Sequence, residues 1–185
     1  SDLLSGPRTL EILSILMGEP AVLFKEKVNF KLPGAAGFKA HQDAPAFSTF
    51  GHRYHITMMV AIDDSTIENG CLEISDPVEV YTLLPQADDK TVAPTIETQL
   101  SWRPLEVSAG DIVFFDSYIP HRSAVNHSQN ARRAIFSTYN RCAEGSVRDQ
   151  YFAEKRISFP PECERVLGVD YAVTNSPYNV GNPIR

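Results

Sequence analysis

The sequence predicts an all-β core, built as an antiparallel barrel or sandwich, with helices flanking it near the two ends of the chain. Three observations support this fold class. About seven short segments have the composition or alternation of strands. Turn residues separate these segments at short intervals, and helical patterns occur only near the ends. Nothing in the chain resembles a Gly-rich phosphate loop.

Length and composition indicate one globular domain over residues 1–185 whose partner is a small molecule. The chain is 43% hydrophobic and 22% charged, which suits a single sizeable core. Its net charge of -6 argues against binding to nucleic acid or to an anionic membrane, because such surfaces need clustered Lys and Arg. Cys71, Cys142 and Cys163 form no Cys-x-x-Cys pair, so we expect a reducing, cytoplasmic location. The longest apolar run, residues 58–62, is too short to cross a bilayer.

The beginning of the chain predicts one helix followed by one strand. Pro7 marks the start of a short helix and Gly18 its end, and the many apolar residues between them predict that it is largely buried. Residues 21–30 alternate with period two, which predicts a strand. One face of this strand carries Val22, Phe24, Val28 and Phe30, and the other carries Lys25, Lys27 and Asn29.

A second alternating segment, residues 54–62, predicts a strand with one face in the core and the other able to line a cavity. The core face carries Ile56, Met58, Val60 and Ile62, and the opposite face carries His55, Thr57, Met59 and Ala61. Before this strand, a Pro- and Gly-rich loop at residues 33–37 delivers the chain to His41. After it, residues 69–74 form a turn into a further strand.

The remaining elements are a surface connection, further strands and a final helix. Residues 76–101 are polar and interrupted by prolines, which predicts a surface excursion. Residues 102–107 and 111–115 flank a Ser-Ala-Gly turn and are predicted to pair as a hairpin. Residues 132–139 read as another strand. Residues 146–149 resemble a capping box that starts a helix, which two prolines end, and the tail is rich in Asn and Pro.

His41, Asp43 and His121 are the candidate metal ligands and catalytic residues. Residues i and i+2 of an extended chain point to the same side, so His41 and Asp43 can converge on one point, which we expect His121 to join. Two imidazoles and one carboxylate on one face of an octahedron are the ligand set of non-haem Fe(II) enzymes. A His-x-Asp pair alone is weak evidence, because composition by itself predicts about 0.3 such pairs in this chain.

An arginine on the following strand is the candidate anchor for a 2-oxo acid co-substrate. The far carboxylate of such a molecule needs a cation deeper in the site, and Arg suits it through its bidentate fork. Arg132 is the candidate, and Arg133 competes with it because strand alternation sends only one of them inward. Ser123 shares strand parity with His121, so its hydroxyl is predicted to bind the same carboxylate.

Several motifs occur together and in a fixed order. They are Lys31-Leu-Pro-Gly34, His41-Gln42-Asp43, Asn69-Gly-Cys-Leu-Glu73, Gly110-Asp-Ile-Val-Phe-Phe115, His121-x-Ser123-x-x-Asn126-x-Ser128 and Arg132-Arg-Ala134. Through them the chain resembles, over nearly its whole length, the phytanoyl-CoA dioxygenase family of Fe(II)- and 2-oxoglutarate-dependent oxygenases. The resemblance implies a double-stranded β-helix, the cupin-like jelly roll. It also implies iron ligation by His41, Asp43 and His121, and 2-oxoglutarate binding by Arg132 with help from Ser123 and Gln42.

The same resemblance implies an activity. Enzymes of this kind hydroxylate a substrate C–H bond with dioxygen and 2-oxoglutarate, releasing succinate and CO2, and ascorbate serves as reductant in the assay. Halogenating relatives have a small residue at the position of Asp43, so the carboxylate here favours hydroxylation. Residues 27–34 and 41–45 resemble bacterial members that act on small phosphonates such as 2-aminoethylphosphonate. A small phosphonate is therefore one candidate substrate, and natural-product tailoring and acyl-CoA hydroxylation are left open beside it.

The chain departs from the family pattern in two places. It begins at Ser1 without Met, and the family has a longer N-terminal helical region than residues 1–18 provide, so we expect a longer natural N-terminus. After the Asn-Gly-Cys-Leu-Glu motif the family has a Pro-Gly-Ser-His-like loop, whereas residues 74–78 read Ile-Ser-Asp-Pro-Val. A lid over the substrate is therefore expected to be shortened or missing.

Substrate contacts and one alternative function remain open. Lys31 and Arg122 are candidates for binding an anionic substrate, and His55 and Met59 are candidates from the possible cavity face. Two imidazoles, a carboxylate and a water also suit zinc, so the alternative is a metal-binding jelly roll without oxygenase activity, such as a zinc hydrolase or a sensor. Arg132 favours the oxygenase, because a zinc hydrolase has no use for a dicarboxylate anchor. The sequence leaves the oligomeric state open.

Overall fold

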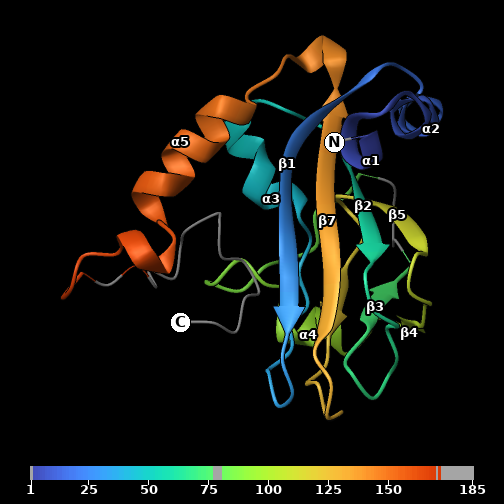
Figure 1. The fold of residues 1–185 in the computed structure, drawn as a ribbon, viewed down its shortest axis with the longest axis vertical. Helices are drawn as coiled ribbons and strands as arrows, with labels where there is room; N and C mark the ends of the chain where they lie inside the picture. The colour runs from blue at the N-terminus through green and yellow to red at the C-terminus, as the bar shows by residue number, and fades with distance from the viewer. Residues whose placement is uncertain (1, 77–80, 170, 172–185) are drawn as a thin grey trace.

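The computed structural model describes residues 2–76, 81–169 and 171, and shows antiparallel sheets with helices at both ends of the chain (Figure 1). The strands are β1 (Ala21–Lys31), β2 (His55–Ala61), β3 (Leu72–Ser75), β4 (Trp102–Leu105), β5 (Ile112–Asp116), β6 (His121–Ser123) and β7 (Arg132–Arg141). The α-helices are α1 (Asp2–Ser5), α2 (Pro7–Met17), α3 (Ala44–Phe47), α4 (Pro94–Glu97) and α5 (Arg148–Ser158), and short 3-10 turns occupy Ser48–Phe50, Cys142–Glu144 and Glu162–Glu164.

The strands form two sheets that share a core. One sheet has the order β1-β7-β2-β5 and the other β4-β3-β6, and all pairings are antiparallel. Side chains from both sheets meet in one apolar cluster, which contains Met59, Leu72, Phe115 and Ala134. The predicted all-β core with flanking helices is therefore confirmed, as a jelly-roll sandwich. Within residues 2–76 and 81–169 the sheets do not close into a barrel.

Strand β1 lies at the edge of the larger sheet, beside β7 (Figure 1). The predicted alternation is present, but the apolar face is not uniformly buried. Phe24 is buried, whereas Val28 is 48% exposed and Phe30 is 63% exposed. The face that carries Lys25, Lys27 and Lys31 lines a cavity of about 460 Å³, which Val28 and Phe30 also border. Alternation thus predicted the strand correctly. Which side chains are buried depends on where the cavity lies, which alternation does not indicate.

Helix α2 begins at Pro7 and ends before Gly18, as predicted. Gly18 has a φ of +73°, the left-handed conformation that ends a helix most easily with glycine. The prediction that the helix is largely buried is wrong, because only Leu13 and Met17 are buried while Ile15 is 74% exposed. The helix packs one face on the core cluster around Tyr139 and leaves the other uncovered by the part of the chain that the structure describes.

The predicted hairpin of residues 102–107 with 111–115 is wrong. Strand β4 pairs with β3 in the smaller sheet, whereas β5 pairs with β2 in the larger one. The turn between them crosses from one sheet to the other, and the amide of Gly110, at a φ of +95°, donates to the carbonyl of Ala61. Strands that are adjacent in sequence therefore lie in different layers.

Residues 81–101 were predicted to lie on the surface, but part of this segment is buried. Leu84 and Val92 are buried and form a cluster with Ala40, and the amide of Val92 donates to the Ala40 carbonyl. This segment therefore supports the backbone just before His41. Of residues 74–78, where the expected lid change lies, 77 and 78 lie outside the described residues, as do residues 172–185 of the Asn- and Pro-rich tail.

Helix α5 flanks β1 (Figure 1). Its Tyr151 packs against Phe24. The predicted capping box is wrong, because the N-cap is Val147 and no side chain caps the helix. The helix ends at Ser158, ahead of the two prolines, as predicted. No helix of the described residues is long and apolar enough to cross a membrane.

Candidate metal centre and cavity

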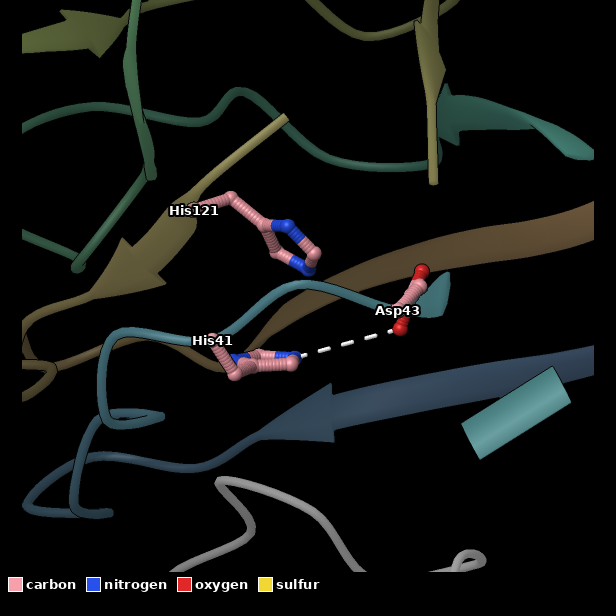
Figure 2. Close-up of side chains that lie close together, drawn as sticks. All are labelled: His41, Asp43 and His121. Atoms are coloured by element: carbon pink, nitrogen blue, oxygen red, sulfur yellow. Dashed lines mark ion pairs between the residues drawn. The ribbon is translucent and has the colours of Figure 1, made fainter. Parts of the chain in front are cut away.

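The structure brings His41, Asp43 and His121 together (Figure 2). His41 and Asp43 lie on the extended segment that leads into α3, and His121 opens β6. Two backbone hydrogen bonds, His41 N to His121 O at 3.0 Å and His121 N to His41 O at 2.9 Å, hold the two segments together. One nitrogen or oxygen atom from each of the three side chains lies within 4.8 Å of the others, and His41 Nε2 is 4.0 Å from Asp43 Oδ1.

Backbone carbonyls fix the orientation of the two imidazoles. His41 Nδ1 lies 2.7 Å from the Lys39 carbonyl oxygen, and His121 Nδ1 lies 3.0 Å from that of Ile119. A carbonyl only accepts, so each Nδ1 carries the proton and each Nε2 keeps a free lone pair. Burial, followed by the charge of His121, lowers the pKa of His41 to about 3. His41 is therefore neutral at physiological pH, as a metal ligand must be.

Asp43 is ionised despite its burial. Burial by itself would raise the pKa of Asp43, but electrostatic interactions with His121, Lys25, His41 and Lys27 together outweigh it and lower the pKa to about 2. The centre thus offers two imidazole nitrogens and one carboxylate, all facing one point. This donor set fits a divalent transition metal with open coordination positions.

A cavity of about 460 Å³ opens beside the three residues. Its wall combines aromatic side chains with a strongly basic set, and that basic set is Lys25, Lys27, Lys31, Arg122, Arg132 and Lys155. The single carboxylate among the described lining residues is Asp43. Such an excess of positive charge on the wall of one cavity attracts anions.

Arg132 and Lys31 are buried cations without an acidic partner in the described part of the chain. They face each other in the register of β1 and β7, and their exposed fractions are 6% and 5%. Arg132 Nη2 donates to the Gly70 carbonyl at 2.9 Å, and its Nε is buried with no hydrogen-bond partner. A buried guanidinium that lacks a counter-ion is costly, so an anion at this end of the cavity would be strongly stabilised.

Lys31 is held by oxygen atoms only. Its Nζ donates to Gly70 O at 3.2 Å, to Ser123 Oγ at 3.0 Å and to the Ala124 carbonyl. Burial, followed by the charge of Arg132, lowers the pKa of Lys31 to about 8. Gly70 is needed here, because its φ is +70° and a β-carbon would come within 2.7 Å of Lys31 Nζ and 2.4 Å of the Ala124 oxygen.

Ser123 completes this end of the cavity. Its Oγ accepts from Lys31 Nζ and, at 3.1 Å, from the amide of Phe38. No described residue accepts its hydroxyl proton, which leaves that proton available to a ligand oxygen. Of the two candidate arginines, only Arg132 lines the cavity, whereas Arg133 is exposed and forms a bidentate pair with Asp63 at 2.8 and 2.7 Å.

Gln42 does not belong to the cavity wall, so its predicted role in 2-oxoglutarate binding is wrong. Its Nε2 donates to the carbonyls of Thr82 at 3.0 Å and Tyr118 at 2.6 Å, and its Oε1 accepts from the Leu84 amide at 2.8 Å. The side chain is 2% exposed and its hydrogen bonds all go to backbone. Gln42 therefore ties three segments together behind the metal ligands.

Replacing Gln42 by Ala is expected to lower the free energy of unfolding by about 1–3 kcal/mol, because buried backbone groups lose their partners. Chemical denaturation measures this change, and Gln99→Ala, at an exposed helix end, is the matched control. A stable variant with a raised Michaelis constant for 2-oxoglutarate would contradict the structural role.

Three predicted substrate contacts need correction. His55 is fully buried against Phe24 and Phe47, and Met59 lies in the cluster between the sheets, so neither lines the cavity. Arg122 does line it, but its charge is already paired. It bonds Glu73 at 2.9 Å and Glu97 at 3.0 Å. A residue so neutralised is poorly suited to bind an anionic substrate.

Sequence reasoning missed three cations of the cavity wall, Lys25, Lys27 and Lys155. A signal existed for two of them, because Lys25 and Lys27 share strand parity with Lys31 and so must share its face. Lys155 comes from α5, and no local pattern indicates that this helix covers the cavity.

Comparisons with known proteins agree with this geometry. The family model described as phytanoyl-CoA dioxygenase matches residues 2–134. A 2-aminoethylphosphonate dioxygenase from Uncultured bacterium HF130_AEPn_1 is 54% identical over 182 residues, which cover 98% of this chain and 70% of that protein. A methylphosphonate hydroxylase from Gimesia maris is 43% identical over 157 residues, which cover 85% of this chain and 60% of that protein.

The fold also resembles solved structures. The epimerase SnoN in complex with Fe3+, alpha ketoglutarate and nogalamycin RO superposes with a TM-score of 0.64 at 21% identity, over 76% of this chain and 58% of that one. The chain thus spans 60% to 70% of the length of the two sequence relatives and 58% of this structure.

Proposed function

The chain belongs to the phytanoyl-CoA dioxygenase family, and from that premise we propose that it is an Fe(II)- and 2-oxoglutarate-dependent dioxygenase that hydroxylates a C–H bond of a small phosphonate. In this reaction one atom of dioxygen enters the substrate as a hydroxyl group. The other enters succinate, and 2-oxoglutarate loses CO2. The family match and the 54% identical relative support the reaction class and the substrate class.

One observation carries the proposal. A cluster of two imidazoles and one carboxylate shares a cavity with two buried cations that have no acidic partner among the described residues. A metal site alone would need only the first group. The second group is what a dicarboxylate co-substrate requires, since its far carboxylate must be bound away from the metal.

The residues at the metal end fit iron. His41 and His121 would bind it through Nε2, because each Nδ1 is engaged with a carbonyl, and Asp43 would bind through its carboxylate. Bound iron would supply the activation of dioxygen, for which open coordination positions are needed. Asp43 occupies one ligand position with a carboxylate, which supports hydroxylation as the outcome.

At the other end, Arg132, Lys31 and Ser123 would hold the far carboxylate of 2-oxoglutarate. Arg132 has a free Nε, Lys31 lies across the strand pair from it, and Ser123 has a hydroxyl proton to donate. Lys31, predicted as a substrate contact, is therefore reassigned to the co-substrate. The same two cations argue against a zinc hydrolase or sensor, because burying two charges costs free energy and neither function needs them to bind a dicarboxylate.

Succinate formation tests the proposed function. With Fe(II), ascorbate, dioxygen and 2-oxoglutarate, the protein is expected to form succinate slowly, and methylphosphonate or 2-aminoethylphosphonate is expected to accelerate it. The Zn(II)-loaded protein is the control and should form none, because zinc has no redox chemistry. An iron-loaded protein that forms no succinate with or without a phosphonate would contradict the proposal.

A further inference from the structure

Three lysines of the cavity wall are assigned neither to iron nor to 2-oxoglutarate. Lys25 and Lys27 lie on the cavity face of β1, and Lys155 projects from α5, which packs against that strand. None forms an ion pair with any described residue. They are close enough to repel one another, since the charges of Lys27 and Lys155 both lower the pKa of Lys25.

Aromatic rings hold these ammonium groups in place. Lys25 Nζ lies 4.6 Å from the ring centroid of Phe47, and Lys27 Nζ lies 5.4 Å from that of Phe38. Lys155 Nζ lies 5.8 Å from the ring of Tyr151. A ring face attracts a cation but does not neutralise it, so the positive charge of the cluster is retained.

The cluster lies toward the metal end of the cavity, away from Arg132. Asp43 acts electrostatically on both Lys25 and Lys27, whereas Arg132 acts on Lys31. Along an extended strand, Lys27 and Lys31 are separated by about 13 Å, since each residue advances the chain by roughly 3.3 Å. This backbone separation and the different electrostatic partners suit two anions, one at each group of cations.

We propose that Lys25, Lys27 and Lys155 form the subsite that binds the phosphonate group of the substrate beside the metal centre. This inference rests on the proposed function for the identity of the substrate. A phosphonate has three oxygens on a tetrahedral phosphorus and carries up to two negative charges, so it can accept from three ammonium groups at once. Binding there would leave the carbon chain of a small phosphonate next to His41, Asp43 and His121.

Desolvation supports the assignment for Lys25 and Lys155, which are partly buried, whereas Lys27 is exposed. Desolvation is the main cause that lowers the pKa of Lys25 to about 7, and it also lowers the pKa of Lys155. Three ammonium groups that form no ion pair with a described residue gain most from a dianion. Because Met removes the charge and keeps an unbranched side chain, Lys→Met variants at these positions relieve repulsion and are expected to fold.

Phosphorus NMR tests the subsite without relying on turnover. Methylphosphonate is titrated into Zn(II)-loaded protein in the presence of 2-oxoglutarate. Lys25→Met, Lys27→Met and Lys155→Met are each expected to raise its dissociation constant about tenfold, and Lys25→Met/Lys27→Met about a hundredfold. Lys90→Met, at an exposed loop position, is the matched control and should bind as the wild type does. Methanesulfonate, a monoanion of similar shape, should bind more weakly than methylphosphonate.

Kinetics with Fe(II) gives the second readout. The lysine variants should raise the Michaelis constant for the phosphonate and leave substrate-free succinate formation and the Michaelis constant for 2-oxoglutarate unchanged. The subsite would be overturned if the double variant bound the phosphonate as tightly as the wild type, or if the wild type bound no phosphonate. A raised Michaelis constant for 2-oxoglutarate in the lysine variants would also overturn it. Binding that depends on the lysines in a protein that forms no succinate would instead contradict the proposed function alone.

Discussion

The Asp43→Asn variant is expected to lose phosphonate hydroxylation and to bind Fe(II) at least about 100-fold more weakly than the wild type. Mutating a residue that only orients a metal ligand already weakens metal binding by up to about 100-fold, so loss of a ligand is expected to weaken it at least as much. The substitution keeps the size of the side chain and removes the charge that attracts the metal. Anaerobic equilibrium dialysis with metal analysis measures the affinity, and succinate formation measures the activity.

Asp76→Asn is the matched control for this variant. Asp76 is an exposed residue paired with Arg103 at 2.6 Å, and it lies outside the cavity. It should bind iron and turn over as the wild type does. If Asp43→Asn retains the affinity and activity of the control, Asp43 is not a ligand and the metal centre is misassigned.

Replacing Arg132 by Met is expected to raise the Michaelis constant for 2-oxoglutarate by about 30-fold or more, because truncating one partner of a buried charge pair costs at least about 2 kcal/mol. Fe(II) affinity should stay at the wild-type value, since Arg132 does not contact the three ligands. The variant should also be at least as stable as the wild type in the absence of ligands. It removes a buried charge for which the described residues provide no acid.

The neighbouring residue provides a strict control. Arg133→Met removes the same charge one position along β7, but from a side chain that faces solvent and pairs with Asp63. Its Michaelis constant for 2-oxoglutarate should not change. Equal increases in both variants would show that the effect is one of overall charge, and Arg132 would lose its role as the anchor.

The strand rule of alternating side chains accounts for what the sequence predicted well. It placed His41 and Asp43 on one side of an extended segment, and the structure brings their side chains together with His121. It also sends only one of Arg132 and Arg133 inward, and Arg132 is the one that lines the cavity. The motifs indicated the family, and the match over residues 2–134 confirms it.

The rule of alternating side chains also shows that Gln42 was wrongly predicted to bind 2-oxoglutarate. Gln42 lies between His41 and Asp43, so its side chain must point to the opposite side, where it bonds the backbone of Thr82 and Leu84. Parity alone excluded it from the site that its two neighbours form.

Other errors depended on which strands pair, which a single sequence does not specify. Strand β2 is central in its sheet, and Thr57 is its one residue that lines the cavity, whereas His55 and Met59 pack against other side chains. Arg122 is neutralised by Glu73 because their strands pair with these residues in register. In a jelly roll consecutive strands can enter different sheets, which is why the expected hairpin between β4 and β5 does not form.

The most direct test of the central claim is an isotope experiment with the iron-loaded protein, 2-oxoglutarate, methylphosphonate and labelled dioxygen. Mass spectrometry is expected to find one labelled oxygen in the hydroxylated phosphonate and one in succinate, with the two products in equal amounts. Hydroxylated product without label, or an iron-bound protein that forms neither product with any small phosphonate, would contradict it.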